Sequence, residues 1–177
     1  MKLGGCMERL LIMDKKDYNE ALPRFRRPSV RGIIISEGKV AMVYSKKFDY
    51  YKFPGGGIEN NEAHIQTLVR EVSEETGLTI IPDTVKEFGS VLRIQLSSYA
   101  QDTIFEQENF YYLCEVESDL QSQSLDEYEL DEGFTLCYVD PRDAIEVNRT
   151  HEHYGYDEAL IEREARVLEW IIDKELI

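Results

Sequence analysis

The chain has 177 residues, of which 42% are hydrophobic, and it carries a formal net charge of −15 at pH 7. This length and apolar content suit a single domain over residues 1–177 with a substantial core. So acidic a chain repels long polyanions, and we expect no long nucleic acid as a partner. Small phosphates can still bind, because divalent cations bridge negative groups.

Inspection of the sequence finds no signal for export or membrane insertion. The apolar run near the N-terminus is too short for a signal peptide, and no window approaches membrane-spanning length. The three cysteines, Cys6, Cys114 and Cys137, lack metal-ligand spacing, and the last two sit in apolar runs typical of buried residues. We therefore expect a cytoplasmic protein with reduced thiols and no membrane partner.

Residues 1–28 are predicted to form an N-terminal arm. Residues 10–13 suit a short strand, after which Pro23 and Pro28 keep the backbone extended or turned. We expect this arm to pack on the edge of the domain or on a second subunit, as in a homodimer.

The next segment is predicted to form two strands and a loop. The β-branched run over residues 30–35 is typical of a buried strand. Residues 37–39 form a turn, and residues 40–44 return as a second strand. A charged, aromatic loop over residues 46–51 then leads towards the glycines at 55–57.

A helix is predicted from about residue 62 or 63 to residue 76. Its apolar residues recur at i, i+3, i+4 and i+7, which places them in one buried stripe. They are Ile65, Leu68, Val69 and Val72. Gly77 is a helix stop, because glycine tolerates the left-handed conformation that a C-terminal cap requires.

The second half of the chain is predicted to contain short strands and a second long helix. The strands cover residues 78–81, 85–88, 91–96, 110–116 and 134–139. A polar loop is expected over residues 117–133, and a helix starts at Pro141. Residues 157–175 form a helix whose apolar stripe suits core packing, with a helix–helix dimer contact as the alternative. This order of elements predicts an α+β fold with a mixed sheet and helices packed on its faces.

Three acids, Glu71, Glu74 and Glu75, fall on one face of the first helix, within about a third of its circumference. Carboxylates this close repel one another, and a divalent cation removes the repulsion. Clustered hard oxygen ligands favour Mg²⁺, or Mn²⁺ as a substitute, over zinc. A solvated acidic face is the usual interpretation of an isolated segment of this kind.

Two neighbouring features favour the metal-site interpretation. Pro54 and the glycines at 55–57 lead from a strand into the helix, and glycines let backbone groups approach a phosphate or a metal closely. Arg70 directly precedes the first acid and is expected to organise the carboxylates. The joint spacing predicts a site for a metal and a diphosphate, with Gly55 and Gly57 contacting the substrate.

This stretch resembles the signature of the Nudix (MutT-like) hydrolases. That signature is a glycine, five residues, Glu, seven residues, Arg-Glu, an aliphatic residue, any residue, Glu-Glu, any residue, Gly and an aliphatic residue. Every specified position matches, in the order Gly56, Glu62, Arg70, Glu71, Val72, Glu74, Glu75, Gly77 and Leu78. The order of strands from about Val30 to Ile145 is also similar to this family. The resemblance implies the Nudix fold, a mixed sheet sandwiched between helices (α/β/α).

The resemblance also implies a reaction. The family cleaves a nucleoside diphosphate linked to another moiety, such as a nucleoside triphosphate or ADP-ribose, by attack of water on phosphorus. Glu71, Glu74 and Glu75 would hold divalent cations, and the backbone carbonyl of Gly56 would add a ligand. Either Glu71 or Glu75 would be the base, Arg70 would orient the carboxylates, and Glu62 would be structural.

Some members of the family recruit a further acid from a later loop, and Glu129 is the candidate here. A solvated loop charge is the more ordinary interpretation of that residue. For the substrate, Tyr44 and Tyr51 precede the glycines and are candidates to stack a base. Tyr99 and Phe105 flank a loop that is a second candidate wall of the pocket.

Other aromatic and basic residues near the glycines are weaker candidates. Phe48 and Tyr50 are further stacking candidates, whereas Phe53 is more typical of the core. The basic candidates for phosphate contacts, most of them expected to be ordinary surface charges, are Arg26, Arg27, Arg31, Lys46, Lys47 and Lys52. His151 and His153 are expected to be loop histidines, because no third metal ligand stands nearby.

Two other functions are weighed against hydrolysis. One is a catalytically silent Nudix domain that senses a nucleotide or binds a protein, although such a domain would be expected to lose acids from the signature. The other is an acidic protein-interaction domain without phosphate chemistry, which leaves the spacing from glycine to glutamate unexplained.

Overall fold

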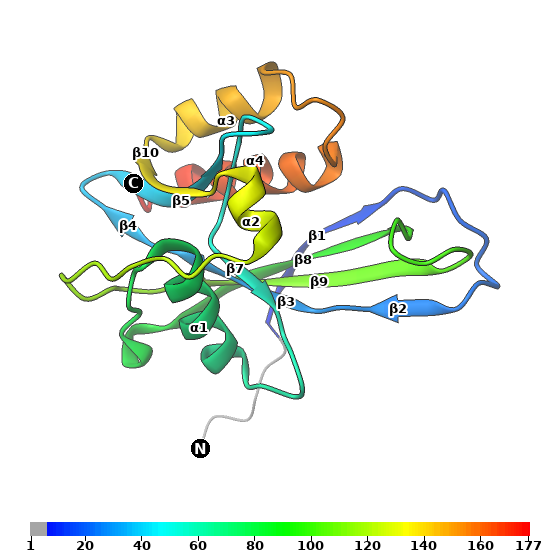
Figure 1. The fold of residues 1–177 in the computed structure, drawn as a ribbon, viewed down its shortest axis with the longest axis horizontal. Coiled ribbons are helices and arrows are strands. Elements are labelled where there is room, and N and C mark those ends of the chain that lie inside the picture. Colours follow the sequence, from blue (N-terminus) through cyan, green and yellow to red (C-terminus); the bar gives the residue numbers. More distant parts are fainter. Residues whose placement is uncertain (1–6) are drawn as a thin grey trace.

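The computed structural model describes residues 7–177, so Cys6 and the start of the N-terminal arm lie outside the described part of the chain. Two β-sheets and four α-helices make up this part, which confirms the predicted α+β class (Figure 1). None of its helices is both long and apolar enough to cross a membrane.

The larger sheet is mixed and has the strand order β1-β8-β9-β3-β7, with β2 paired to β9. Its strands are β1 (Arg9–Asp14), β2 (Arg24–Arg26), β3 (Ser29–Ile33), β7 (Gly55–Gly57), β8 (Lys86–Leu96) and β9 (Ile104–Leu113). The strand predicted over residues 10–13 is confirmed as β1, which adds to the sheet edge in parallel with β8. The described part of the arm, from residue 7 onwards, thus packs on the domain edge through β1.

The smaller sheet is antiparallel and has the order β10-β5-β4, with β6 paired to β5. Its strands are β4 (Ile35–Ser36), β5 (Lys39–Ser45), β6 (Tyr50–Lys52) and β10 (Thr135–Val139). The apolar run predicted as one strand over residues 30–35 is divided between the two sheets, because its start pairs with β9 and β7 and its end pairs with β5.

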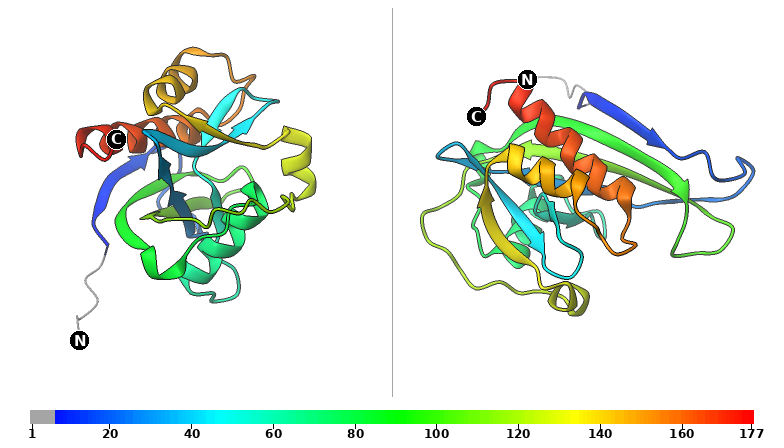
Figure 2. Two further views of the ribbon diagram at one scale, coloured as in Figure 1. Left: turned by 90° about the vertical axis from the view of Figure 1, so that its left-hand side faces the viewer. Right: turned by 90° about the horizontal axis from the view of Figure 1, so that it is seen from above.

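Helices cover both sides of the sheets, which confirms the predicted sandwich (Figures 1 and 2). They are α1 (His64–Thr76) on one side, α3 (Pro141–Thr150) and α4 (Glu158–Asp173) on the other, and the short α2 (Glu127–Glu132). Alternation along β3 explains the two cores: Val30 and Ile34 pack with Leu68 of α1, whereas Ile33 packs with Leu168 of α4. Side chains of β3 at 29, 31 and 33 therefore face α4.

The apolar stripes of the two long helices pack into the core as predicted, except at one residue of α1. Ile161, Ala165 and Leu168 of α4 are at most 1% exposed, so this stripe belongs to the core of its own chain. Ile65 of α1 is 43% exposed instead of buried. The buried face of α1 therefore includes Glu75, which is 1% exposed, and excludes Ile65.

Four predictions for the second half of the chain are wrong in detail. The strand predicted over residues 110–116 is β9, which begins earlier, at Ile104, and ends at Leu113. The strands predicted over residues 85–88 and 91–96 are one strand, β8, with a register shift between Glu87 and Gly89, because glycine inside a strand accommodates a bulge. Residues 78–81 form only an isolated bridge, between Ile80 and Val116. The loop predicted over residues 117–133 contains α2, whose capping box of Asp126 and Glu129 is a signal that the sequence carries.

Gly77 ends α1 in the left-handed conformation, at φ 77°, and a Cβ added there would overlap the carbonyl oxygen of Gln121. We expect Gly77→Ala to lower the free energy of unfolding by about 2 kcal/mol, because it adds a clash with backbone to the left-handed penalty of about 1 kcal/mol. Gly38→Ala is the control, since Gly38 has φ 73° and no described atom lies within 4 Å of an added Cβ. If thermal or urea unfolding showed that Gly77→Ala and Gly38→Ala lower the free energy of unfolding equally, the expected clash would be contradicted.

Candidate active site

A cavity of about 500 Å³ opens on the α4 side of the larger sheet, beside the glycine strand β7. Its lining comes from strands, from α2 and from the N-terminal end of α4. The lining residues are Arg27, Arg31, Lys52, Gly55, Gly56, Gly57, Arg93, Ser98, Tyr99, Phe105, Gln107, Tyr128, Phe134, Tyr156, Asp157 and Leu160. The cavity therefore combines cations, aromatic rings and the predicted glycines.

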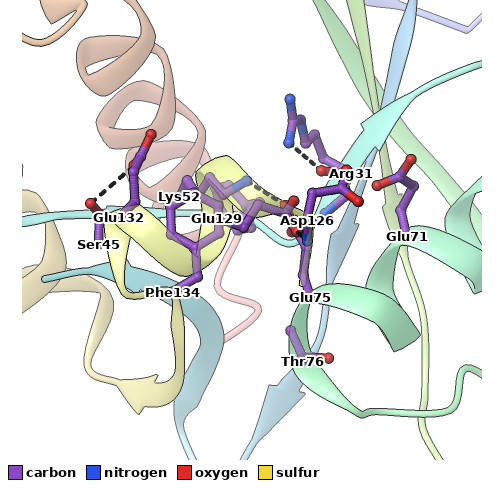
Figure 3. A network of polar contacts seen from close by, with 12 residues as sticks. Arg31, Ser45, Lys52, Glu71, Glu75, Thr76, Asp126, Glu129, Glu132 and Phe134 are labelled. Atoms are coloured by element: carbon purple, nitrogen blue, oxygen red, sulfur yellow. Dashed lines mark hydrogen bonds and ion pairs between the residues drawn. The ribbon is translucent and has the colours of Figure 1, made fainter. Parts of the chain in front are cut away.

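Two glutamates of α1, Glu71 and Glu75, lie beside residues that line this cavity (Figure 3). The Glu71 carboxylate lies so close to Gly56 that a Cβ at that position would overlap it. Glu75 accepts hydrogen bonds from Lys52 Nζ at 2.5 Å and from the Gly55 backbone N–H at 2.9 Å. Glu74 is the outermost of the three, with its side chain 41% exposed. The spacing on α1 thus places Glu71 and Glu75 against the glycines and leaves Glu74 towards solvent.

Arg70 binds several acids at once. Its Nη1 donates to Glu71 at 2.8 Å and to Glu74 at 3.2 Å, and its Nη2 donates to Glu62 at 2.9 Å. The hydrogen bonds from Arg70 and from Thr67 lower the pKa of Glu62 to about 2. Burial raises the pKa of Glu71, and the bond from Arg70 partly offsets that rise. Arg70 therefore holds the acids of the signature together.

Glu129 lies on α2 and is only 4% exposed, so the interpretation as a solvated loop charge is wrong. Its carboxylate accepts hydrogen bonds from the Asp126 backbone N–H at 2.8 Å and from the Tyr128 hydroxyl at 3.0 Å. Burial raises its pKa, and the nearby charge of Glu75 raises it further. The fold thus brings Glu129, a fourth acid from a distant segment of the chain, near Glu75 of α1.

The donor atoms at this place suit a hard divalent cation. They are the carboxylate oxygens of Glu71 beside Gly56, where no Cβ takes up the space, and those of Glu75 beside Gly55, with Glu74 on the same helix face. Within residues 7–177, no three His, Cys, Asp or Glu side chains come close enough to hold an ion as they stand. Arg70 and Lys52 bind the carboxylates instead. A cation therefore has to compete with these two basic residues for the oxygens.

We expect Gly56→Ala to reduce kcat/KM by about 10²-fold or more with little loss of stability. The added methyl group would overlap only the end of the Glu71 side chain, which can rotate away but then leaves its position. Gly55→Ala is the contrasting variant, because its Cβ would overlap the Val30 backbone and the residue has φ 141°. Activity assays and thermal unfolding of both variants check this. Full activity of Gly56→Ala would contradict the placement of Glu71.

The two tyrosines predicted to bind substrate do not line the cavity. Tyr44 and Tyr51 are directly opposite in the β5–β6 pair, and their rings contact each other at a centroid distance of 5.0 Å. The Tyr44 hydroxyl donates to Asp49. Successive side chains of a strand point to opposite faces, so Tyr51 points away from the side on which its neighbour Lys52 lines the cavity, and Tyr44 shares the face of Tyr51. We correct this part of the prediction.

Other aromatic residues form the walls of the cavity. Tyr99 and Phe105 lie there as suggested, whereas Tyr128, Phe134 and Tyr156 were missed. Phe53 is fully buried, as expected. The missed residues come from segments that are far from the signature in sequence, and no local pattern marks them.

The basic candidates divide into two groups. Arg27, Arg31 and Lys52 line the cavity, and the remaining three (Arg26, Lys46 and Lys47) do not. Arg31 is 7% exposed and donates from Nη1 to the Gly55 carbonyl at 2.6 Å. The histidines bind locally as expected, since His151 contacts Asp49 and His153 contacts backbone carbonyls.

Comparison with known proteins identifies the family. The NUDIX domain model matches residues 25–160. The chain is 41% identical over 56 residues to the 8-oxo-dGTP diphosphatase of Buchnera aphidicola subsp. Schizaphis graminum, a match that covers 29% of this chain and 43% of that protein. It is 29% identical over 124 residues to the RNA pyrophosphohydrolase of Hydrogenovibrio crunogenus, covering 64% and 73%.

A solved structure has the same fold. The NUDIX hydrolase from Nitrosomonas europaea superposes with a TM-score of 0.54 at 18% identity, over 81% of this chain and 90% of that one. The family model spans more than half of the chain, and the complete signature lies within the matched residues. The chain therefore belongs to the Nudix family.

Proposed function

We propose that this protein is a Mg²⁺-dependent Nudix pyrophosphohydrolase that cleaves the diphosphate linkage of a small nucleoside diphosphate derivative. One observation carries the proposal: the signature glutamates of α1 meet the glycine strand at the edge of a cavity lined by Arg27, Arg31 and Lys52. The relatives named as a diphosphatase and a pyrophosphohydrolase support the same reaction class. Nucleoside triphosphates and ADP-ribose are the substrates we would test first.

Glu71, Glu74 and Glu75 would hold the cation, with the Gly56 carbonyl and Glu129 as further ligands. Bound Mg²⁺ screens the diphosphate charge, lowers the pKa of bound water and polarises the bridging oxygen. Mn²⁺ is the expected substitute, because it suits the same oxygen ligands.

The chain's own residues would orient the substrate and move the proton. Either Glu71 or Glu75 would accept the proton from the attacking water, since both carboxylates face β7. Arg70 would keep the carboxylates in position through its bonds to Glu71 and Glu74. Gly55 and Gly57 would let the diphosphate approach the backbone closely, as residues without a Cβ permit.

The test is hydrolysis of a panel of nucleoside triphosphates, ADP-ribose, dinucleotides and nucleotide sugars. We expect turnover of at least one compound with Mg²⁺, its loss in EDTA and its recovery with Mg²⁺ or Mn²⁺. The control variant Glu127→Gln should hydrolyse the same compounds as the wild type, because Glu127 is an exposed acid on α2 with no proposed role. Absence of turnover across the panel would contradict the proposal.

The same experiment separates hydrolysis from the catalytically silent alternative. The ion pair of Lys52 with Glu75 favours that alternative, because it already neutralises one of the proposed metal ligands. Tight nucleotide binding by calorimetry without cleavage would support a sensor. A cytoplasmic location and a possible homodimer remain part of the proposal, to be checked by fractionation and by light scattering.

A further inference from the structure

Arg93 of β8 is a buried cation in the wall of the cavity, away from the glutamates. Only 5% of the surface of this residue is exposed. Its Nη2 forms an ion pair with Asp157 at 3.0 Å, whereas its Nε and Nη1 have no hydrogen-bond acceptor anywhere in residues 7–177. A buried guanidinium with two unsatisfied nitrogens is costly unless something else binds it. Its position in the lining makes those nitrogens a candidate contact for a ligand in the cavity.

A neighbouring buried arginine, by contrast, has acceptors for its hydrogen bonds. Arg163 of α4 is fully buried, but Glu164 and Asn109 accept its hydrogen bonds. Burial and the nearby charge of Arg163 both lower the pKa of Arg93. Among the described lining residues, Asp157 is the one acid, against the four cations Arg27, Arg31, Lys52 and Arg93. The lining residues thus carry more positive than negative charge, within a chain of net charge −15.

The sheet order separates the backbone of Arg93 from the glycine strand. Two strands, β9 and β3, lie between β8 and the glycine strand β7. At about 4.8 Å per strand spacing, the backbone of Arg93 is roughly 14 Å across the sheet from the glycines. The guanidinium carbon lies 5.8 Å from the ring centroid of Phe105, and Tyr99 packs on Phe105 in turn. An anion at Arg93 would thus belong to a different part of the substrate from the diphosphate at Gly56.

We propose that Arg93 binds a second anionic group of the substrate, a phosphate or a carboxylate that is not part of the diphosphate that is cleaved. This deepens the proposed function, on which it rests, by restricting the substrate to nucleotides that carry such a group beyond the diphosphate. The anion would accept hydrogen bonds from Nε and Nη1, the two nitrogens that Asp157 does not bind. Charge-assisted bonds of this kind supply selectivity for phosphates and carboxylates.

The test measures binding instead of turnover. Adenosine 3′,5′-bisphosphate and guanosine 3′,5′-bisphosphate are each compared with the corresponding 5′-monophosphate by calorimetry in Mg²⁺ buffer. None of these probes contains a diphosphate linkage, so the result does not depend on the proposed hydrolysis. We expect at least one bisphosphate to bind about tenfold or more tightly than its monophosphate, and Arg93→Gln to reduce that ratio to about twofold or less.

Two further variants separate binding from a structural role. Asp157→Asn removes the ion pair but preserves the cap of α4, because asparagine is a good N-cap residue. We expect this variant to keep or increase the bisphosphate advantage, since the Arg93 charge is then unopposed. Arg142→Gln, whose arginine is exposed on α3, should leave the ratio unchanged.

Three outcomes would overturn the proposal. One is that neither bisphosphate binds more tightly than its monophosphate, or that none of the probes binds. The second is that Arg93→Gln folds and retains the wild-type ratio. The third is that Arg93→Gln and Asp157→Asn lower the melting temperature alike and change the ratio alike, which would assign Arg93 to fixing α4. Arg93→Lys keeps the charge, and partial retention of the ratio in this variant would support anion binding if Arg93→Gln is unstable.

Discussion

Glu75→Gln is expected to lower kcat by about 10³-fold for any substrate the enzyme hydrolyses. The substitution removes the charge of the most buried acid of the signature, whose oxygens are bonded to Lys52 and to the Gly55 backbone N–H. Lys52 and the Gly55 N–H bind different oxygens of Glu75, so glutamine, with a single carbonyl oxygen, loses one of these acceptors. Glutamine also cannot take a proton from water, and it is a weaker ligand for a hard cation. The KM should change much less than kcat, because the cavity walls are untouched.

The measurement is steady-state kinetics together with thermal unfolding of the same preparation. Glu127→Gln carries the identical chemical change at an exposed position of α2 and should retain wild-type kinetics. Circular dichroism at the assay temperature establishes that Glu75→Gln is folded, which matters because the substitution leaves Lys52 without its carboxylate. Activity within threefold of wild type in a folded Glu75→Gln variant would remove this residue from the mechanism.

Glu164→Ala is expected to destabilise the protein strongly, and more than Gly77→Ala does. Glu164 and Arg163 are both fully buried and form an ion pair under α4. The second carboxylate oxygen of Glu164 accepts the Phe53 backbone N–H at 2.9 Å. Removing the carboxylate leaves a buried guanidinium and an orphan N–H, at a cost of about 3–5 kcal/mol. For a chain of this length the melting temperature should fall by roughly 10 °C.

A matched control lies on the same helix. Glu162 binds Arg149 at 2.9 Å, but that pair is 42% and 33% exposed. Glu162→Ala should therefore cost no more than about 1 kcal/mol, the usual value of a surface ion pair. Urea unfolding of the two variants compares them directly. Losses of similar size would show that the buried pair contributes no more than the exposed one.

The consequence of Glu164→Ala for the site follows from where Phe53 lies. Phe53 immediately precedes Pro54 and the glycines of β7, so the bond from its N–H to Glu164 ties the glycine strand to α4. We expect the folded fraction of this variant to show reduced kcat/KM as well. Glu162→Ala should leave kcat/KM unchanged.

Much of the fold and of the reaction centre follows from local sequence. The helix that carries Glu71 and Glu75 is predicted to within about a residue at each end, and Gly77 caps it as expected. The helix is predictable from the 3.6-residue period of its apolar residues. Its end is predictable because glycine easily adopts the left-handed conformation of a C-terminal cap. The signature identifies the family for the same reason, because its positions all lie on one strand, one turn and one helix.

The tertiary structure decides the substrate cavity and the buried charges. Arg93, Tyr128 and Asp157 reach one cavity from β8, α2 and the start of α4, and nothing near them in sequence indicates that they meet. Burial of Glu129 and of the Arg163–Glu164 pair runs against the general exposure of charged residues, so sequence alone favours the wrong environment. Tyr44 and Tyr51 show the converse, since they are close to the glycines along the chain but share the face of their strands opposite to that of Lys52, which lines the cavity. The chemistry is encoded locally, whereas the shape and charge of the cavity arise from long-range packing of segments that only the folded chain brings together.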